Sequence, residues 1–258
     1  IITVTLVIFG IGFMEGAMNN FLQSTAVISS GHVKVVTKAY EKESSQLPND
    51  LALFETNKII QNLSDLYPNY FWTPRITFGG LLDTPNEDGD TKEQGPVFGI
   101  GIDFHSKTSR QIEIWELEKY LLRGNLPKNT NDALISTKLA KQLSVNVGST
   151  VTLISTTMDN AFTTYNFEIT GIFNLNKGQV DRQMMLVDIS GARQALGMEG
   201  AASEILGYHQ SLYYNDNEAT SMRNDFNLTI SDSITKVLRD EASLSLIHIS
   251  EPTRQASI

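Results

Sequence analysis

The feature that most constrains this chain is an uncharged apolar run at its N-terminus. From Ile1 to Met14 no side chain is charged, and nearly every residue is apolar or glycine. A bilayer core demands about 20 such residues in a helix. Because the sequence starts on two isoleucines and not on methionine, we interpret the run as the end of a longer hydrophobic helix.

The pattern changes after Glu15 but does not stop. Apolar residues recur at helical spacing up to Ala26. Ser29-Ser30-Gly31 then supplies a stop signal, and His32–Thr37 alternates like a strand. We therefore expect residues 1–28 to be the end of transmembrane helix 1 and a stalk that delivers a strand into a soluble domain. A secretory signal segment and a buried core helix are the alternatives for this run.

Charge and cysteine content exclude several classes of protein. The 258-residue chain has a net charge of -9 and no stripe of Lys and Arg, which argues against nucleic acid as a partner. It contains no cysteine, which excludes a disulfide scaffold, a thiolate metal site and a cysteine nucleophile. The length suffices for one large domain or two small ones.

Helical and strand patterns are mixed along the rest of the chain, which predicts an α+β fold. Asn49 or Asp50 is expected to cap a helix with an apolar face from Leu51 to Leu66. Near the C-terminus, the sequence from 217 to 240 is polar and contains one weak helical pattern at 234–238. Further strands are predicted at 70–78, 96–104, 133–135, 150–155, 165–173, 183–187 and 203–214. Further helices are predicted at 112–122, with Trp115 and Leu122 buried, and at 137–143 and 189–196.

Three features in the predicted strands limit their interpretation. Pro74 favours an edge strand or a bulge, since proline cannot donate to a ladder. The acidic loop Asp83–Gly95 lacks two of the ligands of an EF-hand loop and is interpreted as a solvated hairpin tip. Gly99 and Gly101 lie inside a strand and have no third glycine after them, so they do not form a dinucleotide-binding loop.

No constellation of catalytic or metal-ligating residues is apparent. The chain has no P-loop, no G-x-S-x-G elbow and no H-E-x-x-H helix. His32, His105 and His209 lie far apart in sequence, and His32 is interpreted as a structural residue. Trp72 and Trp115 are assigned to packing, and Asp181 to a turn or cap. We therefore predict no catalytic, cofactor-binding or metal residue and no cofactor, and we assign no substrate-binding residue.

The order of these motifs resembles the ABC-transporter permeases of the lipoprotein-releasing (LolC/LolE) and MacB type. The resemblance begins with the apolar helix, Asn-Asn-Phe at 19–21 and Ser-Gly-His-Val at 30–33. It continues through Gly-Ile-Asp at 101–103, Leu-Arg-Gly at 122–124 and Phe-x-Ile-x-Gly-Ile-Phe at 167–173. Asp181 and the strand at 183–187 match the usual continuation, and the resemblance extends to about Asp216.

The resemblance implies a two-lobed mixed α/β periplasmic domain of MacB/LolE type that follows a transmembrane helix. Residues 29–240 would form this periplasmic core domain, with an inserted second lobe at roughly 110–210. In such a permease the domain couples ATPase-driven motion to lipoprotein release or substrate export. The implied location is the bacterial inner (plasma) membrane, with the domain in the periplasm.

The implied partners are an ABC ATPase subunit, a second permease subunit in a homo- or heterodimer, and a lipoprotein or exported substrate. ATP hydrolysis is expected on a separate or fused ATPase, so the chain itself is not predicted to be an enzyme. A MacB-type efflux permease and an FtsX-type permease are alternatives of the same architecture. A singly membrane-anchored extracytoplasmic binding module is the alternative from a different class.

The C-terminal segment Leu244–Arg254 fits nothing around it. Back-translated in one reading frame, it resembles a transposase mosaic-end adapter used in sequencing libraries. We therefore interpret residues 244–258 as a non-native adapter tail and expect the natural frame to be lost near Ser243. His248 is accordingly not offered as a ligand. An ordinary polar C-terminus is the alternative.

Overall fold

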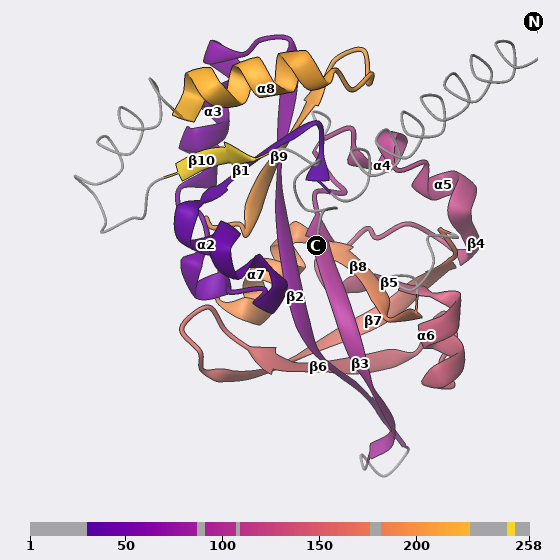
Figure 1. The fold of residues 1–258 in the computed structure, drawn as a ribbon. Coiled ribbons are helices and arrows are strands. Elements are labelled where there is room, and N and C mark those ends of the chain that lie inside the picture. The colour runs from indigo at the N-terminus through magenta and orange to yellow at the C-terminus, as the bar shows by residue number, and fades with distance from the viewer. Residues whose placement is uncertain (1–29, 87–90, 107–108, 176–181, 228–246, 251–258) are drawn as a thin grey trace, which may run out of the picture.

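A long central strand, β2 (Tyr70–Pro85), is shared by two groups of strands in the computed structural model (Figure 1). The structure describes residues 30–86, 91–106, 109–175, 182–227 and 247–250. The predicted membrane segment 1–28, Asp181 and the weak helical pattern at 234–238 lie outside these ranges. Within them, no helix is both long and apolar enough to cross a bilayer.

The first group of strands pairs with the N-terminal part of β2. Residues Tyr70–Arg75 of β2 pair antiparallel with β9 (Glu204–His209), and β9 pairs antiparallel with β1 (Val33–Thr37). The strand predicted from the alternation of His32–Thr37 is therefore confirmed. On the other edge of β1 lies β10 (Ile247–Ser250), also antiparallel. The interpretation of 244–258 as an adapter tail stays a prediction.

The second group of strands pairs with the C-terminal part of β2. From Ile76 onward β2 forms a long hairpin with β3 (Thr91–Ile102), which confirms the hairpin predicted around Asp83–Gly95. Its remaining strands are β8 (Met184–Asp188), β5 (Asp132–Ser136), β7 (Phe162–Phe173), β4 (Leu121–Gly124) and β6 (Thr150–Thr156). Their order after β3 is β8-β5-β7-β4, with β6 paired to both β7 and β2. The pairs β3·β8 and β5·β7 are parallel, so the sheet is mixed.

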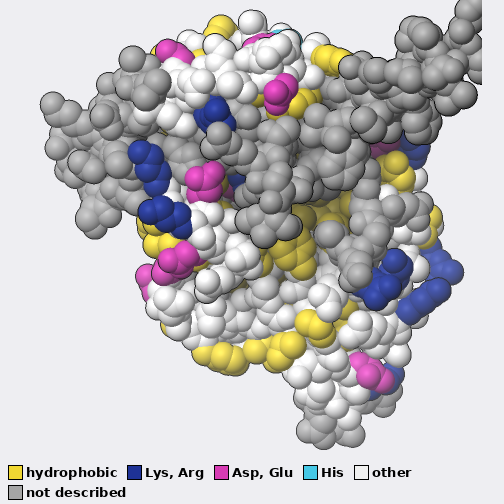
Figure 2. Space-filling model, viewed as in Figure 1, with side chains coloured by type: hydrophobic (Ala, Val, Ile, Leu, Met, Phe, Trp, Pro, Cys, Tyr) yellow, Lys and Arg dark blue, Asp and Glu magenta, His cyan; other side chains and the backbone are white. Residues whose placement is uncertain are grey.

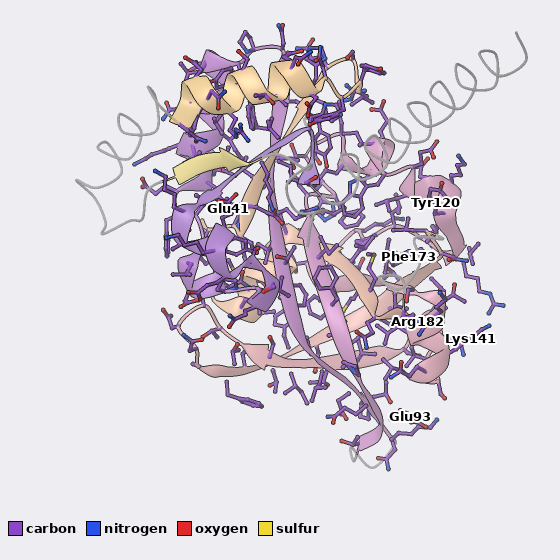
Figure 3. All side chains as sticks on the ribbon, viewed as in Figure 1. Glu41, Glu93, Tyr120, Lys141, Phe173 and Arg182 are labelled. Carbon is purple, nitrogen blue, oxygen red and sulfur yellow. The ribbon has the colours of Figure 1, made fainter. Side chains whose placement is uncertain are left out.

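Helices cover both faces of this second group. The helices α6 (Thr137–Gln142) and α7 (Ile189–Leu196) pack on one face, and α4 (Gln111–Ile114) and α5 (Leu117–Tyr120) on the other. All residues of β5 and β8 are buried as a result, and they alternate between the two cores. This burial explains why the two strands read as continuous apolar runs. Side chains of both cores fill the space between the ribbons (Figure 3).

The first group has a core of its own. The helices α3 (Thr56–Leu66) and α8 (Asp216–Asp225) contribute Ile59, Leu63 and Met222 to a cluster that includes Trp72 of β2. Two short 3-10 turns, η2 (Ser44–Gln46) and η3 (Asn49–Leu51), follow α2 (Lys38–Glu43) on the same side of the molecule. Residues 76–203 thus form the second group, and the first group brings together residues before and after them. The predicted limits of the inserted lobe, 110–210, stay a prediction.

Local hydrogen bonds explain where the helices begin. The Ser136 hydroxyl accepts from the backbone N–H of Leu139, which confirms the predicted cap of α6. The Asp188 carboxylate accepts from the backbone N–H of Ser190 and caps α7. The helix α7 ends at Gly197, which has φ 66° and supplies the left-handed conformation that ends a helix.

Two predicted helices are wrong in their extent. The helix predicted from Leu51 begins only at Thr56, because Glu55 takes a left-handed φ of 49°. Leu66, expected in its apolar face, is 46% exposed. The helix predicted at 112–122 is divided into α4 and α5 by Glu116, which is again left-handed.

Three further differences between the prediction and the structure concern Leu122, the helix α8 and Pro74. Leu122 was expected to be buried in a helix, but it lies in β4 and is 59% exposed. The helix α8 was not predicted, because its sequence is polar on almost every side. Pro74 lies in a strand with neighbours on both sides, but at its own position β2 pairs with Ile205 of β9, and the pairing with β3 starts at Ile76. The N–H of Thr77 faces Ser203, which directly precedes β9, and because N–H groups alternate sides along a strand, position 74 faces the other side, where β3 is not yet paired. The missing N–H therefore interrupts no ladder there.

Candidate functional site

The most unusual arrangement of charge in the described residues is a buried cluster of three side chains. Lys34 comes from β1, Arg75 from β2 and Glu204 from β9, and each side chain is at most 7% exposed. The register explains how they meet: Arg75 lies directly opposite Glu204, and Lys34 lies opposite Leu206, two residues along β9. Cross-strand and diagonal neighbours are within reach of long side chains.

The Glu204 carboxylate holds the two cations together. Arg75 donates to its Oε1 from Nη2 at 2.8 Å and from Nε at 3.0 Å. The Nζ of Lys34 lies 3.6 Å from Oε2. Burial disfavours ionisation of Glu204, but the charges of Arg75 and Lys34 outweigh it and lower the pKa of this carboxyl. The three strands are therefore joined by an ion cluster and not only by their ladders.

Polar contacts extend the cluster along β2. The Thr77 hydroxyl shares a 2.9 Å hydrogen bond with the Tyr40 hydroxyl, and the Thr77 N–H donates to Ser203 Oγ at 3.0 Å. Thr73 Oγ1 donates to Gln111 Oε1 at 3.2 Å. Because β-strand residues two apart share a face, Thr73, Arg75 and Thr77 form one polar row. The row lies where the two groups of strands meet.

The cluster also lies close to the point where the chain enters the domain. β1 starts at Val33, and Lys34 is its second residue. His32, just before it, is buried and its Nδ1 accepts from the N–H of His209 at 3.0 Å. Its pKa is lowered to about 4 by burial and by the nearby His209, which keeps the ring neutral. Its burial and its bond to His209 fit the interpretation of His32 as a structural residue, but its Nε2 is buried and has no hydrogen-bond partner among the described residues, so only one of its two ring nitrogens is satisfied.

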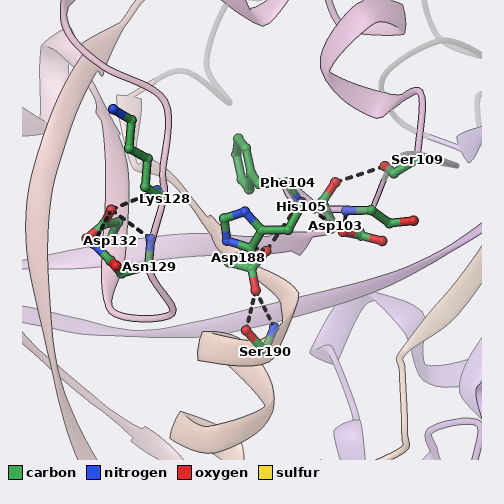
Figure 4. A network of polar contacts seen from close by, with 10 residues as sticks. Asp103, Phe104, His105, Ser109, Lys128, Asn129, Asp132, Asp188 and Ser190 are labelled. Atoms are coloured by element: carbon green, nitrogen blue, oxygen red, sulfur yellow. Dashed lines mark hydrogen bonds and ion pairs between the residues drawn. The ribbon is translucent and has the colours of Figure 1, made fainter.

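A second network brings together a serine, a histidine and an aspartate, but not in the order that nucleophilic catalysis requires (Figure 4). His105 Nε2 lies 3.6 Å from Asp188 Oδ2, and Ser190 donates both its hydroxyl and its N–H to Asp188 Oδ1. The serine thus bonds to the carboxylate and not to the imidazole, so the histidine is not placed to take its proton. We assign Asp188 to capping of α7 and to the N–H of Phe104.

The other residues that the sequence analysis discussed lie in different parts of the fold. Trp72 and Trp115 lie in two different cores, as expected for packing residues. Gly99 and Gly101 lie inside β3, which confirms that they form no phosphate loop. Among the described residues, no group of three or more His, Cys, Asp or Glu side chains could hold a metal ion.

Sequence reasoning missed the Lys34–Arg75–Glu204 cluster. Each member is a single charge in an apolar or aromatic stretch: Lys34 in HVKVVT, Arg75 in FWTPRITF and Glu204 in SEILGY. A charge on the buried side of a predicted strand is the signal that could have found them. The pairing between β2 and β9 could not be inferred, because these strands are more than a hundred residues apart.

Comparison with known proteins gives the family. The family model of the MacB-like periplasmic core domain matches residues 1–235. Among solved structures, the chain is similar to the periplasmic region of MacB from Actinobacillus actinomycetemcomitans, with 12% identity, a TM-score of 0.49, and coverage of 89% of this chain and 95% of that one. No curated protein matches the sequence. Because the family model covers most of the chain, the chain belongs to the family of MacB-like periplasmic core domains and is part of an ABC transporter permease of that type.

Proposed function

We propose that this domain passes ATPase-driven motion of the membrane part of a permease to a substrate outside the membrane. The observation that supports it is the entry point of the chain. The first described strand, β1, is anchored at its second residue by the buried Lys34–Glu204 ion pair. A displacement of the segment before Ser30 would therefore move β1, β9 and β2 together and would not simply stretch a loop.

The ATP would be hydrolysed on a separate or fused ABC ATPase, not on this chain. A second permease subunit, identical or different, would complete the transporter. The domain would then lie in the periplasm beside the bacterial inner membrane, and the segment 1–28 would be the end of the first transmembrane helix and its stalk.

A flexible insertion tests this relay. A short Gly-Ser linker placed directly before Ser30 would uncouple the N-terminal segment from β1 without touching the cores. In proteoliposomes that hold the complete permease and its ATPase, we expect substrate export to fall about tenfold or more and ATP hydrolysis to change by less than about twofold. The matched control is the same linker between Asp159 and Asn160, an exposed turn between β6 and β7, which should leave both rates unchanged. Unchanged export with the linker before Ser30 would show that motion does not pass through this junction.

The class of substrate needs its own measurement. We propose a lipoprotein or another exported substrate, and the two are separated by supplying the same proteoliposomes with a lipoprotein or with a hydrophobic peptide. Stimulated ATP hydrolysis and release of the lipoprotein alone would identify a lipoprotein-releasing permease. Transport of the peptide alone would identify an efflux permease of MacB type. A complete gene with no further membrane spans and no ATPase partner would instead favour the singly anchored binding module.

A further inference from the structure

One end of the sheet combines an open strand edge with a groove. β4 is the last strand on its side of the sheet, and in the described part of the chain it pairs only with β7. A groove of about 520 Å³ lies between β4 and α6. Its lining includes Leu122, Arg123, Ala140, Lys141, Val145 and Ile172. The site is separate from the Lys34–Arg75–Glu204 cluster and does not depend on the proposed relay.

Among the residues that the structure describes, no strand pairs with the edge of β4 that faces away from β7. The register moves from Leu121↔Phe173 to Arg123↔Ile172, so Leu122 is left without a partner on β7. Leu122 is also 59% exposed, although it is a large apolar residue. The N–H of Leu121 is already bonded to the carbonyl of Leu117, so the edge offers another chain the remaining backbone groups that face away from β7. An exposed apolar side chain beside such an edge favours association.

The groove beside this edge carries positive charge on an acidic protein. The chain as a whole has a net charge of -9, yet the charged residues of the groove lining are Arg123 and Lys141. Both side chains are exposed, and neither forms an ion pair with any residue that the structure describes. Figure 2 shows Lys and Arg side chains gathered on the side of the molecule where Figure 1 places α6, and Figure 3 labels Lys141 there.

We propose that β4 and this groove bind an extended, acidic segment of a partner protein. The segment adds a strand to the edge of β4, and successive side chains point alternately toward and away from the groove. Ala140, Val145 and Ile172 form the apolar part of the groove, and Arg123 and Lys141 pair with carboxylates of the segment. Charge complementarity sets the choice of partner, because a basic segment would meet two cations that form no ion pair with the described residues.

The test uses two labelled synthetic peptides and the complete chain. In one peptide glutamate alternates with valine, and in the other lysine alternates with valine. We expect fluorescence anisotropy to detect binding of the glutamate peptide only, and the binding to weaken as salt is added. Hydrogen exchange should show that the bound peptide protects the backbone amides of Leu121–Gly124.

Two variants and one control locate the site. Arg123→Glu combined with Lys141→Glu should weaken glutamate-peptide binding about tenfold or more, because attraction becomes repulsion. Leu122→Asp should also weaken it about tenfold or more, because it replaces an exposed apolar side chain of the groove lining by a negative charge that repels the acidic segment. The control, Lys38→Glu with Lys42→Glu, makes the same change of charge on exposed positions of α2 and should leave binding unchanged.

Four outcomes would overturn the proposal. They are no binding of the glutamate peptide, equal binding of both peptides, binding that persists in the double charge reversal, and protection of β4 by self-association without peptide. The last would identify a second copy of this chain as the occupant. All three substitutions change exposed side chains, so the variants are expected to fold, and circular dichroism checks this.

Discussion

Glu204 is the residue on which the buried charge cluster depends, because it is the anion between two cations. Its loss would remove the carboxylate to which Arg75 donates two hydrogen bonds and with which Lys34 forms its ion pair, in a place where both cations are buried. The net value of such a cluster is a different quantity, since replacement of a whole buried ion cluster by apolar residues is often neutral or stabilising. The loss of stability on removing Glu204 alone therefore does not measure how much the complete cluster stabilises the pairing of the three strands.

We predict that Glu204→Gln lowers the free energy of unfolding by about 3–5 kcal/mol. The triple variant Lys34→Met, Arg75→Met, Glu204→Leu should recover most of this loss, because it removes all three buried charges of the cluster together. Urea unfolding followed by circular dichroism measures both. Equal and large losses in the single and the triple variant would mean that the ion pairs themselves supply net stability.

The carboxylate of Glu204 also makes the free energy of unfolding depend on pH, and the direction of its pKa shift gives the sign of this dependence. The pKa of Glu204 is lower in the folded protein than in the unfolded chain, so its contribution is complete above the ordinary glutamate value of about 4.3. That contribution is lost as the pH falls through the folded value. The triple apolar variant should therefore lose less stability below pH about 4 than the native chain does.

His32 titrates in a different window. Its pKa is about 4 when folded and about 6.5 when unfolded, so the unfolded chain binds the extra proton between these values. The contribution of His32 to the free energy of unfolding is therefore fully present above the pKa of the unfolded chain, and it falls by about 3 kcal/mol as the pH drops from 6.5 to 4. His32→Asn keeps an acceptor for the N–H of His209 and removes the titration. We expect urea midpoints measured across this range to show a smaller slope for the variant, and an unchanged slope would contradict the assignment.

At the scale of elements, the close approach of β3 to an aromatic ring of β2 explains the position of a glycine that strand propensity alone does not. Gly99 of β3 lies directly opposite Phe78 of β2 in the hairpin. A Cβ at position 99 would lie 2.1 Å from the Phe78 ring, so the aromatic ring occupies the space that a side chain would need. This contact is the reason for a glycine in the middle of an otherwise apolar strand.

We predict that Gly99→Ala destabilises the domain by about 1–3 kcal/mol, because the added methyl group displaces the Phe78 ring. Gly79→Ala is the matched control one residue along β2, where the nearest atom outside the chain neighbours is 3.9 Å from an added Cβ. This control should be neutral or stabilising by up to about 1 kcal/mol, since alanine reduces the freedom of the unfolded chain. Thermal unfolding of both variants measures these changes in stability. Equal changes in the two variants would show that the Phe78 ring moves aside freely.

At the scale of the whole molecule, β2 makes one structure of two groups of strands. It carries Trp72 into the core of the first group and Phe78 into that of the second. The third core joins residues of both groups, among them Trp115 of the α4–α5 region and Tyr208 of β9. A continuous strand and a shared core couple the two groups energetically, which is consistent with the proposed relay of motion through the domain.

We therefore predict a single cooperative unfolding transition. The chain has two tryptophans, one in the core of the first group and one in the shared core. Trp72→Phe leaves Trp115 as the fluorescent probe, and Trp115→Phe leaves Trp72. Each variant should give the same urea midpoint by fluorescence as by circular dichroism. Separate midpoints by the two probes within one variant would show that the groups unfold independently.

The local elements of this chain were largely determined by the sequence alone. Period-two alternation predicted β1 and β6, and the segment after the turn at 159–160 was predicted to return as β7, the partner of β6. The strand β8 was predicted from the resemblance to the permease family. Hydroxyl and glycine positions placed the start of α6 and the hairpin. The helix breaks at Glu55 and Glu116 were missed, since nothing in these residues predicts a left-handed conformation. The polar helix α8 was missed because only a few of its side chains are buried.

The tertiary structure alone decided which residues meet. Arg75 and Glu204 are brought together by the pairing of strands far apart in the sequence, and no local pattern specifies such a pair. The groove beside β4 likewise depends on the register of β4 against β7 and on the position of α6. The physical reason is that hydrophobic periodicity specifies which face of an element is buried, whereas the partner of that face is chosen by packing of the whole chain.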